Sequence, residues 1–423
     1  MRKLVLLSLV VTSMFATQNL DELIDIALKN SPDIKISKLD VESAKSGVDF
    51  ATSYYLPQLD LSGQYGKGGS KFKRANGFNN YDVIGATATA SQLIYDFGKT
   101  GGSIESRKYD LSSYNATYSQ AISDKILEVK QKFYDLLKAQ SLISVNEENV
   151  KLNEAQLYRA KRYYEAGIRT KIDISDANVN LINGQINLQN SKYDSRLAYV
   201  NLEKVLGEIG NKIEVENLPL EYNRLYSTLP LVSEDISQLT NYAFKNRYEI
   251  KAYQESIKSA KAALKSVDGD YFPSIGLNGN YALNKVDGDM ALLQAEKQWS
   301  AGVVASWNIF SGFNTNASSQ IAKIAVLKSN ETLLNIKLQI QRDVNEAFIV
   351  VQKTKENVKL NSSLKDSSFE KFDQAQKRYE NGLSDYIELQ QARQEYIDSL
   401  SGLVIAYYSY YQALANLDNS IGR

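Results

Sequence analysis

The sequence predicts an α+β membrane protein that combines strands of membrane-spanning length with very long coiled-coil helices. One observation is a tandem repeat: YYEAGIRTKID at residues 163–173 returns, with changes, as RYENGLSDYIE at 378–388. A second is that neither proline nor glycine interrupts residues 103–166 or 313–381, so nothing there breaks a helix. A third is polar–apolar alternation in the segments that follow Pro57 and Pro273, which is typical of strands with one apolar face.

The first element is a predicted signal peptide at residues 1–16. Arg2 and Lys3 precede an apolar run at 4–11, and small and polar residues follow, which is the order of a secretory signal. A buried strand or helix is the alternative. No later run approaches the ~20 apolar residues of a transmembrane helix. We therefore expect a chain that leaves the cytoplasm and has no helical membrane anchor.

The rest of the chain divides into two copies of one plan. The first repeat, 17–208, is predicted to contain a helix, a β-hairpin at about 57–96 and a long helical hairpin at about 99–207. A segment without clear periodicity, 209–239, contains two prolines and joins the repeats. A helix over 99–166 would be about 100 Å long at 1.5 Å per residue, which predicts a rod over part of the molecule.

The second repeat, 240–423, is predicted to contain the same elements in the same order. Its β-hairpin falls at about 272–310 and its long helical hairpin at about 313–419. In both repeats the long helices carry apolar residues at alternating three- and four-residue spacing, which indicates coiled-coil seams. One seam runs from Ile122 through Val129 and Leu136, and another from Ile397 through Leu400 and Val404.

Each β-hairpin is predicted to supply two strands of about ten residues, the length of a tilted membrane strand. Leu59, Leu61 and Tyr65 share one face of the first strand, and Trp299 to Ile309 alternates in the last. Polar loops are expected at 67–82 and 284–298. A small soluble sheet packed on a helix is the alternative. In lipid the strands must close into a barrel, which four cannot do; two copies would give eight strands, and three would give twelve and an open channel.

The repeated motif is predicted to form the tip of each helical hairpin. Gly167 and Gly382 each follow a long helix and suit the left-handed position just past its end. Thr170 and Asp385 begin the next helices. Asp173 and Glu388 come three residues later, at capping-box spacing.

Composition excludes several classes of function. Lysine plus arginine equals aspartate plus glutamate at 49 each, so no charge excess favours nucleic acid. The chain has no cysteine and no histidine, which excludes thiol and imidazole catalysis, disulfides and the usual zinc sites. No glycine-rich phosphate loop or carboxylate cluster is visible. We expect no enzyme, no catalytic residues, no metal and no cofactor.

Taken together, these motifs resemble the TolC-like outer membrane efflux proteins. The resemblance rests on the tandem repeat, on YLPQLDLSG and YFPSIGLNG at the strand starts, on QLIYDFG and WNIFSGF at the strand-to-helix passages, and on the two tip motifs. It covers nearly the whole mature chain. It implies a homotrimer with a twelve-stranded barrel in the outer membrane lipid of a Gram-negative bacterium and a helical tunnel through the periplasm. It also implies two partners, a periplasmic adaptor (membrane fusion) protein and an inner-membrane pump of the RND, ABC or MFS type.

The resemblance further implies that acidic side chains at the tips surround the tunnel axis. In related proteins the second repeat often carries two acids on adjacent helical turns, whereas here Glu388 is followed by Gln391. The candidates for the pore entrance or gate are Asp173, Asp176, Glu388, Gln391, Arg169, Tyr164 and Tyr379. The candidates for adaptor contact are Gly167, Thr170, Gly382, Ser384 and Asp385. The alternatives are simple helix capping by Asp173 and Glu388 and simple packing by Tyr164 and Tyr379.

Two functions remain open at this point. The first is a passive exit duct of a tripartite efflux or type I secretion system. The second is a secreted coiled-coil structural or adhesion protein with a small soluble sheet. Cell fractionation separates them, because a duct pellets with the outer membrane and needs detergent, whereas a secreted filament does not.

Overall fold

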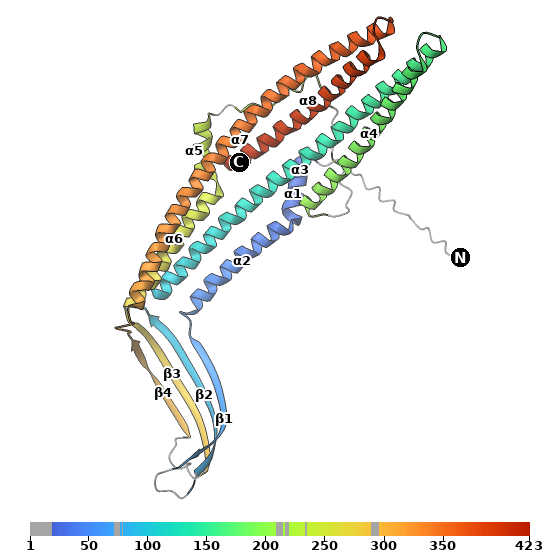
Figure 1. Ribbon diagram of the computed structural model, residues 1–423. Helices are drawn as coiled ribbons and strands as arrows, with labels where there is room; N and C mark the ends of the chain where they lie inside the picture. The colour runs from blue at the N-terminus through green and yellow to red at the C-terminus, as the bar shows by residue number, and fades with distance from the viewer. Residues whose placement is uncertain are drawn as a thin grey trace, which may run out of the picture. The chain divides into compact units, whose positions relative to one another are not determined.

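The computed structural model of the protein describes residues 19–71, 77, 79–208, 215, 220–232, 235–288 and 296–423 (Figure 1). The predicted signal peptide at 1–16 lies outside the described residues. None of the described helices is both long enough and apolar enough to cross a membrane.

Both halves of the chain follow the same order of elements. The first half contains α1 (Leu20–Asn30), α2 (Pro32–Ser53), β1 (Gln58–Ser70), β2 (Asn79–Tyr95), α3 (Lys99–Glu165) and α4 (Lys171–Leu206). The second contains α5 (Ile236–Asn246), α6 (Tyr248–Asp268), a short 3-10 helix η1 (Gly269–Tyr271), β3 (Ser274–Gly288), β4 (Lys297–Ser306), α7 (Asn314–Glu380) and α8 (Tyr386–Ile421). The matching long helices α3 and α7 both have 67 residues, and α4 and α8 both have 36. The predicted α+β fold, with four strands and two long helical hairpins in one chain, is confirmed.

The four strands form one antiparallel sheet in the order β1-β2-β3-β4. Residues directly opposite one another lie on the same face of an antiparallel sheet. One row across all four strands is apolar: Leu61 pairs with Ala88, which pairs with Tyr281, which pairs with Trp299. A neighbouring row on the opposite face is polar and consists of Asp60, Thr89, Asn280 and Ser300. The alternation seen in single segments therefore adds up to one apolar and one polar sheet face.

The strand ends differ from the predicted ones. Residues 67–70 and 79–82, expected in a polar loop, continue the β1–β2 ladder, and an ion pair of 3.7 Å joins Lys67 to Asp82. Residues 284–288, also expected in a loop, continue β3. The predicted loop boundaries were wrong because the hydrogen bonds between strands are made by backbone groups, so polar side chains do not prevent strand pairing. The centres of both predicted loops, 72–76 and 289–295, lie outside the described residues.

Strand β4 has the predicted length of about ten residues, but it begins at Lys297 rather than Trp299 and ends at Ser306 rather than Ile309. Trp307 lies just beyond the strand, and its indole N–H donates to the carbonyl of Tyr271 at 3.1 Å. This bond holds the chain at the passage towards the next helix, so the alternation that continues to Ile309 does not extend the sheet.

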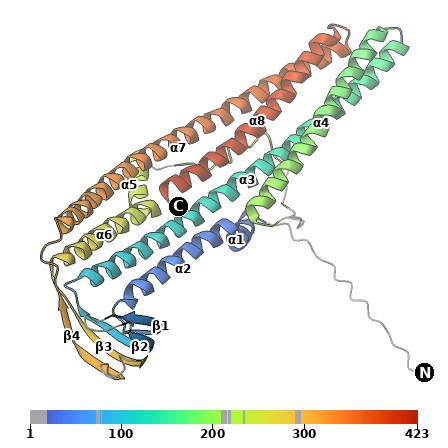
Figure 2. The same ribbon diagram turned by 60° about the horizontal axis from the view of Figure 1, so that its bottom comes forward.

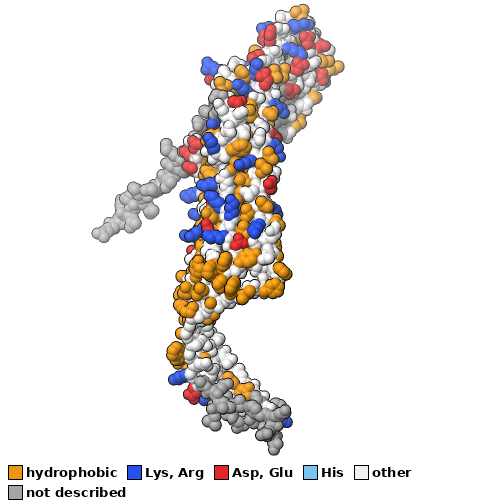
Figure 3. Space-filling model, turned by 90° about the vertical axis from the view of Figure 1, so that its left-hand side faces the viewer, with side chains coloured by type: hydrophobic (Ala, Val, Ile, Leu, Met, Phe, Trp, Pro, Cys, Tyr) orange, Lys and Arg blue, Asp and Glu red, His pale blue; other side chains and the backbone are white. Residues whose placement is uncertain are grey.

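Aromatic side chains gather where the strands meet the helices. The rings of Phe97 and Phe272 stack with their centroids 5.2 Å apart, and Phe310 lies edge-on to Phe313 at 5.6 Å. All four are exposed, and Figure 3 shows hydrophobic side chains concentrated next to the strands. Phe97 and Phe313 adopt positive φ angles of 53° and 66°, so both repeats turn from strand to helix through a strained residue. Exposed aromatic belts of this kind are typical of membrane interfaces.

The chain folds into two compact units, each of which combines both repeats. The strand unit consists of Lys38–Tyr118 and Glu249–Ile336 and therefore contains the sheet and the helices that adjoin it. In this unit the start of α3 approaches the end of α6 closely: a Cβ on Gly102 would lie 2.6 Å from the backbone nitrogen of Ser266. An ion pair of 2.6 Å between Lys99 and Asp270 spans the same approach.

The second unit, which we call the tip unit, consists of Met1–Ser37, Ser119–Tyr248 and Lys337–Arg423. In both ribbon views α3 runs beside α4 and α7 beside α8 (Figures 1 and 2). One apolar cluster, which includes Leu23, Val129 and Leu202, packs α1 against the α3–α4 hairpin. A second, which includes Val145, Ile397 and Val404, packs α3 against α8. Because α3 belongs to one repeat and α8 to the other, the two hairpins share a core.

Candidate functional site: the two hairpin tips

The first tip turns through Gly167, whose φ angle is 71°. Its preceding helix ends with hydrogen bonds from the N–H groups of Ile168 and Arg169 to the carbonyl of Tyr163, at 2.9 and 3.3 Å. The next helix begins with a capping box, in which the carboxylate of Asp173 accepts from the N–H of Thr170 at 3.4 Å. The predicted left-handed glycine and capping box are both confirmed.

The second tip uses the same turn but a different cap. Gly382 has a φ angle of 73°, and the N–H of Leu383 donates to the carbonyl of Arg378 at 2.8 Å. Asp385 caps α8 itself, because its carboxylate accepts from the N–H of Glu388 at 2.9 Å. The carboxylate of Glu388 pairs instead with the guanidinium of Arg378 at 3.4 Å. The acids three residues after Thr170 and Asp385 therefore differ in role, because Asp173 caps its helix whereas Glu388 forms an ion pair.

Arg169 links the two tips directly. Its guanidinium donates to the carbonyl of Ser384 at 2.8 Å, and it lies over the ring of Tyr379 at 4.9 Å from the centroid. Ser384 is half-buried, and its hydroxyl oxygen has no hydrogen-bond partner among the described residues. A second link is the ion pair of 2.9 Å between Arg159 on α3 and Glu380 on α7.

Tyr379 is a core residue of the joined tips, with 1% of its side chain exposed. Its ring contacts those of Tyr163 and Tyr386, with centroids 6.0 and 6.2 Å apart. Its hydroxyl is buried and has no partner among the described residues. Burial raises the pKa of Tyr379; the nearby Arg169 charge acts to lower that pKa and Asp173 to raise it. Tyr379 therefore packs in the shared core, and it also contacts Arg169 of the other tip.

The other candidates are placed less centrally. Tyr164 is 46% exposed, and it is its neighbour Tyr163 that enters the shared core. Asp176 and Gln391 are both exposed; the amide of Gln391 donates to Glu395 at 3.2 Å. Asp176 forms no ion pair within the described ranges, which leaves its carboxylate to face solvent or another chain. Gly167, Thr170, Gly382 and Asp385 are exposed at the turns. Within the described part of the chain, no group of acidic side chains could hold a metal ion.

The tips also contain a network of polar side chains that the sequence analysis did not predict. The amide of Asn180 on α4 donates to the hydroxyl of Tyr386 at 2.8 Å, and its oxygen accepts from Gln390 on α8 at 2.9 Å. Arg393, one turn further along α8, is buried and donates to Asn153 on α3. A signal was available for Arg393, because it lies four residues before Ile397 and so occupies a seam position where an apolar residue is expected. Nothing in the sequence pattern distinguishes Asn180 from other surface polar residues.

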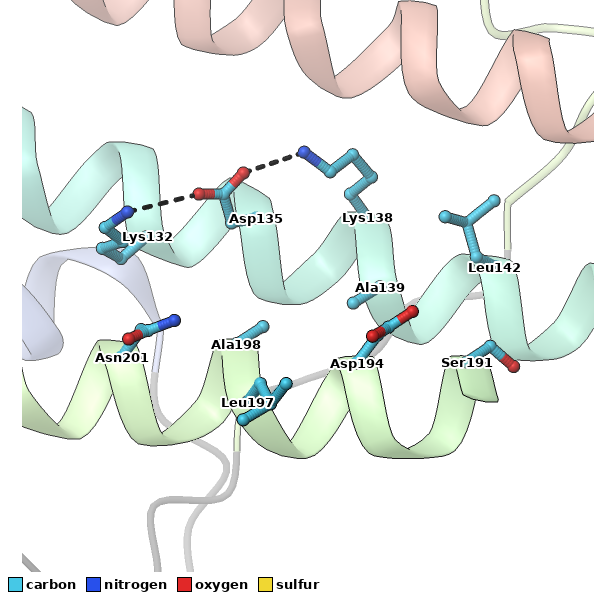
Figure 4. Close-up of a pocket in the computed structure, with 10 residues that line it drawn as sticks. All are labelled: Lys132, Asp135, Lys138, Ala139, Leu142, Ser191, Asp194, Leu197, Ala198 and Asn201. Carbon is cyan, nitrogen blue, oxygen red and sulfur yellow. Dashed lines mark hydrogen bonds and ion pairs between the residues drawn. The ribbon is translucent and has the colours of Figure 1, made fainter. Parts of the chain in front are cut away.

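A groove between α3 and α4 lies in the same unit (Figure 4). It has a volume of about 330 Å³, and Leu142, Ala139, Leu197 and Ala198 provide its apolar wall. At one side Asp135 pairs with Lys132 at 3.6 Å and with Lys138 at 2.8 Å. Burial acts to raise the pKa of Asp135, but the hydrogen bonds from Lys138 and Gln412 and the nearby lysine charges outweigh it and lower that pKa.

Comparison with known proteins identifies the family. The family model described as outer membrane efflux protein matches residues 23–208 and again 239–423, which is most of the chain. The chain belongs to the outer membrane efflux protein family. The double match follows the tandem repeat, and the four strands with two long helical hairpins are the fold that the family relationship leads us to expect.

Individual relatives agree with this assignment. The efflux protein is 22% identical to the toluene efflux pump outer membrane protein TtgC of Pseudomonas putida, over 95% of this chain and 82% of that protein. It is 21% identical to the protein CyaE of Bordetella pertussis, over 77% of this chain and 68% of that protein. Among solved structures, the Campylobacter jejuni CmeC outer membrane channel matches with a TM-score of 0.81 at 16% identity, over 96% of this chain and 86% of that one. As a member of the family, the efflux protein is an outer-membrane exit duct for efflux or type I secretion, and its helical part lies in the periplasm.

Proposed function

We propose that three copies of this efflux protein assemble into one twelve-stranded barrel and one helical tunnel, which conducts substrates passively. The observation that carries the proposal is the sheet itself. It has one fully apolar row and one polar row, and β1 and β4 are edge strands whose outer backbone groups have no partner strand in the described chain. In lipid such edges must pair, and four strands cannot close on themselves. Three copies give twelve strands and an open lumen lined by the polar face.

The helices of the tip unit support the same assembly. A stripe of exposed apolar side chains follows α4 at spacings of three, four and seven residues, which is a coiled-coil pattern. Its members are Val179, Ile182, Ile186, Tyr193, Leu197 and Val200, each between 47% and 63% exposed. Leu197 also lines the α3–α4 groove. Because the open sheet edges already require further copies of the chain, a neighbouring copy is the occupant that fits this stripe and groove.

The tips would form the periplasmic entrance of the tunnel. Three chains bring six tips together, and the contacts made by Arg169 and Tyr379 hold the two tips of each chain in one packed arrangement. Opening would require these contacts to loosen. Asp176, with Glu388 and Asp173 nearby in the two tips, would supply the acidic groups that favour cations.

The proposed partners follow from the passive mechanism. A duct needs an energy source elsewhere, which we assign to an inner-membrane pump of the RND, ABC or MFS type. A periplasmic adaptor would connect that pump to the turns of the two tips. These turns contain the exposed residues Gly167, Thr170, Gly382 and Asp385 and the half-buried Ser384. We propose no enzymatic activity.

Cell fractionation tests the location on which this function depends. The duct should sediment with the outer membrane and be released only by detergent, whereas recovery of the folded protein from the medium without detergent would support the secreted filament instead.

A further inference from the structure

The polar face of the sheet carries one charged side chain within the described strands, that of Asp60 on β1. Its row continues with Thr89, Asn280 and Ser300, which are uncharged. The rows on either side are uncharged as well and consist of Gln58, Ser91, Asn278 and Gly302, and of Ser62, Thr87, Ala282 and Gln298. The other charged residues of the paired strands lie on the opposite face: Lys67, Asp82, Lys285, Asp287 and Lys297. The charge of the described polar face therefore depends on one carboxylate.

The charge of Asp60 has no counter-ion in the described part of the chain. Its side chain is exposed and forms no ion pair with any described residue. On the opposite face, by contrast, Lys67 pairs with Asp82 at 3.7 Å and Lys285 pairs with Asp287 at 3.3 Å. Because a solvent-exposed carboxylate is ionised at neutral pH, Asp60 gives the polar face one uncompensated negative charge per chain.

Asp60 lies at the level of the apolar band of the sheet. Its neighbours in β1, Leu59 and Leu61, belong to the apolar face and are 77% and 81% exposed. Strand β1 continues beyond it through residues 61–70. At the depth of lipid-facing leucines an ionised carboxylate is tolerated only where it meets water, because its burial in hydrocarbon is strongly unfavourable. The side of the sheet that carries Asp60 therefore suits the wall of an aqueous lumen.

We propose that Asp60 makes the inside of the barrel selective for cations over anions. The inference rests on the proposed trimer, in which threefold symmetry places three copies of Asp60 at one level of the lumen. Fixed negative charges on the wall of an aqueous channel attract cations and repel anions. Their influence extends over about 10 Å in 0.1 M salt. Cationic and neutral polar solutes therefore pass this level more easily than anions of the same size.

This ring is separate from the acids of the tips. Asp60 belongs to the strand unit, whereas Asp173, Asp176 and Glu388 belong to the tip unit. Changes to the tips should therefore leave the charge of the barrel wall as it is, and a measurement of the local charge beside Asp60 does not depend on whether the tips are open.

A single cysteine can measure this local charge, because the natural chain contains none. Ser62→Cys places a thiol on the same face, two residues and about 7 Å from Asp60. In liposomes, its reaction rates with a cationic and an anionic methanethiosulfonate are compared. Adding Asp60→Asn should lower the ratio of the cationic to the anionic rate about threefold, since one screened charge at that distance changes the local concentration of each reagent by nearly twofold. An unchanged ratio would overturn the proposal.

A thiol on the opposite face separates this result from a failure of the proposed barrel. Leu61→Cys should react slowly with both reagents, because neither charged reagent enters lipid. If Leu61→Cys reacts as fast as Ser62→Cys, the sheet does not lie in a membrane and the proposed function fails. If Leu61→Cys is protected and Ser62→Cys reacts with a ratio that ignores Asp60, only the selectivity of the barrel is contradicted.

Reversal potentials of the channel in a planar bilayer test the consequence for conduction. In a KCl gradient with about 10 mM on the dilute side, where charges act over about 30 Å, Asp60→Asn should lower the cation preference. Ser300→Asp, which adds a carboxylate to the same row, should raise it. The matched control is Asp82→Asn, which removes a carboxylate from the opposite face and should resemble the wild type. A wild-type reversal potential in Asp60→Asn, or an equal shift in Asp82→Asn, would overturn the role of Asp60 in selectivity whatever the thiol rates show.

Discussion

Removal of the arginine that joins the two tips should loosen the closed entrance. Arg169 makes one charge-assisted hydrogen bond, 2.8 Å to the carbonyl of Ser384, and one cation–π contact, 4.9 Å to the ring of Tyr379. The first contributes about 1.5 kcal/mol and the second about 0.5–1 kcal/mol at a half-buried site. Arg169→Gln therefore removes about 2 kcal/mol of contact between the tips of each chain. That corresponds to about a 30-fold shift of each chain towards separated tips.

Single-channel recording in a planar lipid bilayer measures this shift. If separation of the tips opens the tunnel, Arg169→Gln should show a higher mean conductance or a larger open fraction than the wild type. The control is Arg162→Gln, which removes an exposed arginine near the end of α3 whose side chain makes a weak 4.0 Å ion pair with Glu165 of the same helix. A double-mutant cycle with Tyr379→Leu should show coupling, because both changes remove the same cation–π contact. Equal conductance of Arg169→Gln, Arg162→Gln and the wild type would refute the role of this link in closure.

Three further predictions follow from the sheet, the acids and a tyrosine cluster. Leu61→Lys should impair membrane assembly, since a lysine on the lipid face at mid-membrane costs about 2–4 kcal/mol. Asp60→Asn, on the polar face, should have only a mild effect. Heat-modifiable gel mobility of outer-membrane fractions measures the assembly of both variants, and equal tolerance of the two changes would favour a soluble sheet. Asp176→Asn should lower the cation selectivity of the channel more than Glu388→Gln, because Glu388 is already paired with Arg378 at 3.4 Å. Reversal potentials in a planar bilayer measure this selectivity. Unchanged reversal potentials in both variants would place the constriction elsewhere. Burial and the hydroxyl of Tyr407 raise the pKa of Tyr411 above its ordinary value of 10.0. The stability that its protonated form contributes is therefore fully present below pH 10 and is lost as the pH rises above that value. Alkaline pH should destabilise the wild type more than Tyr411→Phe, and identical profiles of stability against pH would contradict this.

The long helices and their ends were predictable because their signals are local. Glycine at 167 and 382 marks the only break in otherwise uninterrupted helical stretches, and the left-handed conformation at both is what glycine permits at no steric cost. The strand faces were predictable for the same reason, since alternation at period two needs no knowledge of the partner strand. The strand ends were not, because backbone pairing continues through polar residues such as Lys67 and Asp82.

The contacts between the tips could not be predicted, because they join helices of different repeats. Periodicity fixes which residues share a helix face but not the axial register between two helices that are far apart in sequence. Tyr163 rather than Tyr164 enters the core, and Arg169 rather than an acid bridges the tips, only because of that register. The capping role of Asp173 was within reach of the sequence, whereas the pairing of Glu388 with Arg378 was not.

The assembly of three chains is the central claim, and the mass of the purified protein in detergent tests it most directly. Light scattering or native mass spectrometry of the solubilised outer-membrane protein should give three times the mass of the mature chain, after correction for bound detergent. This oligomer should persist on dilution, because its barrel closes only when edge strands β1 and β4 of neighbouring chains pair. A stable monomer, or a dimer whose eight strands would close without an open lumen, would contradict the account.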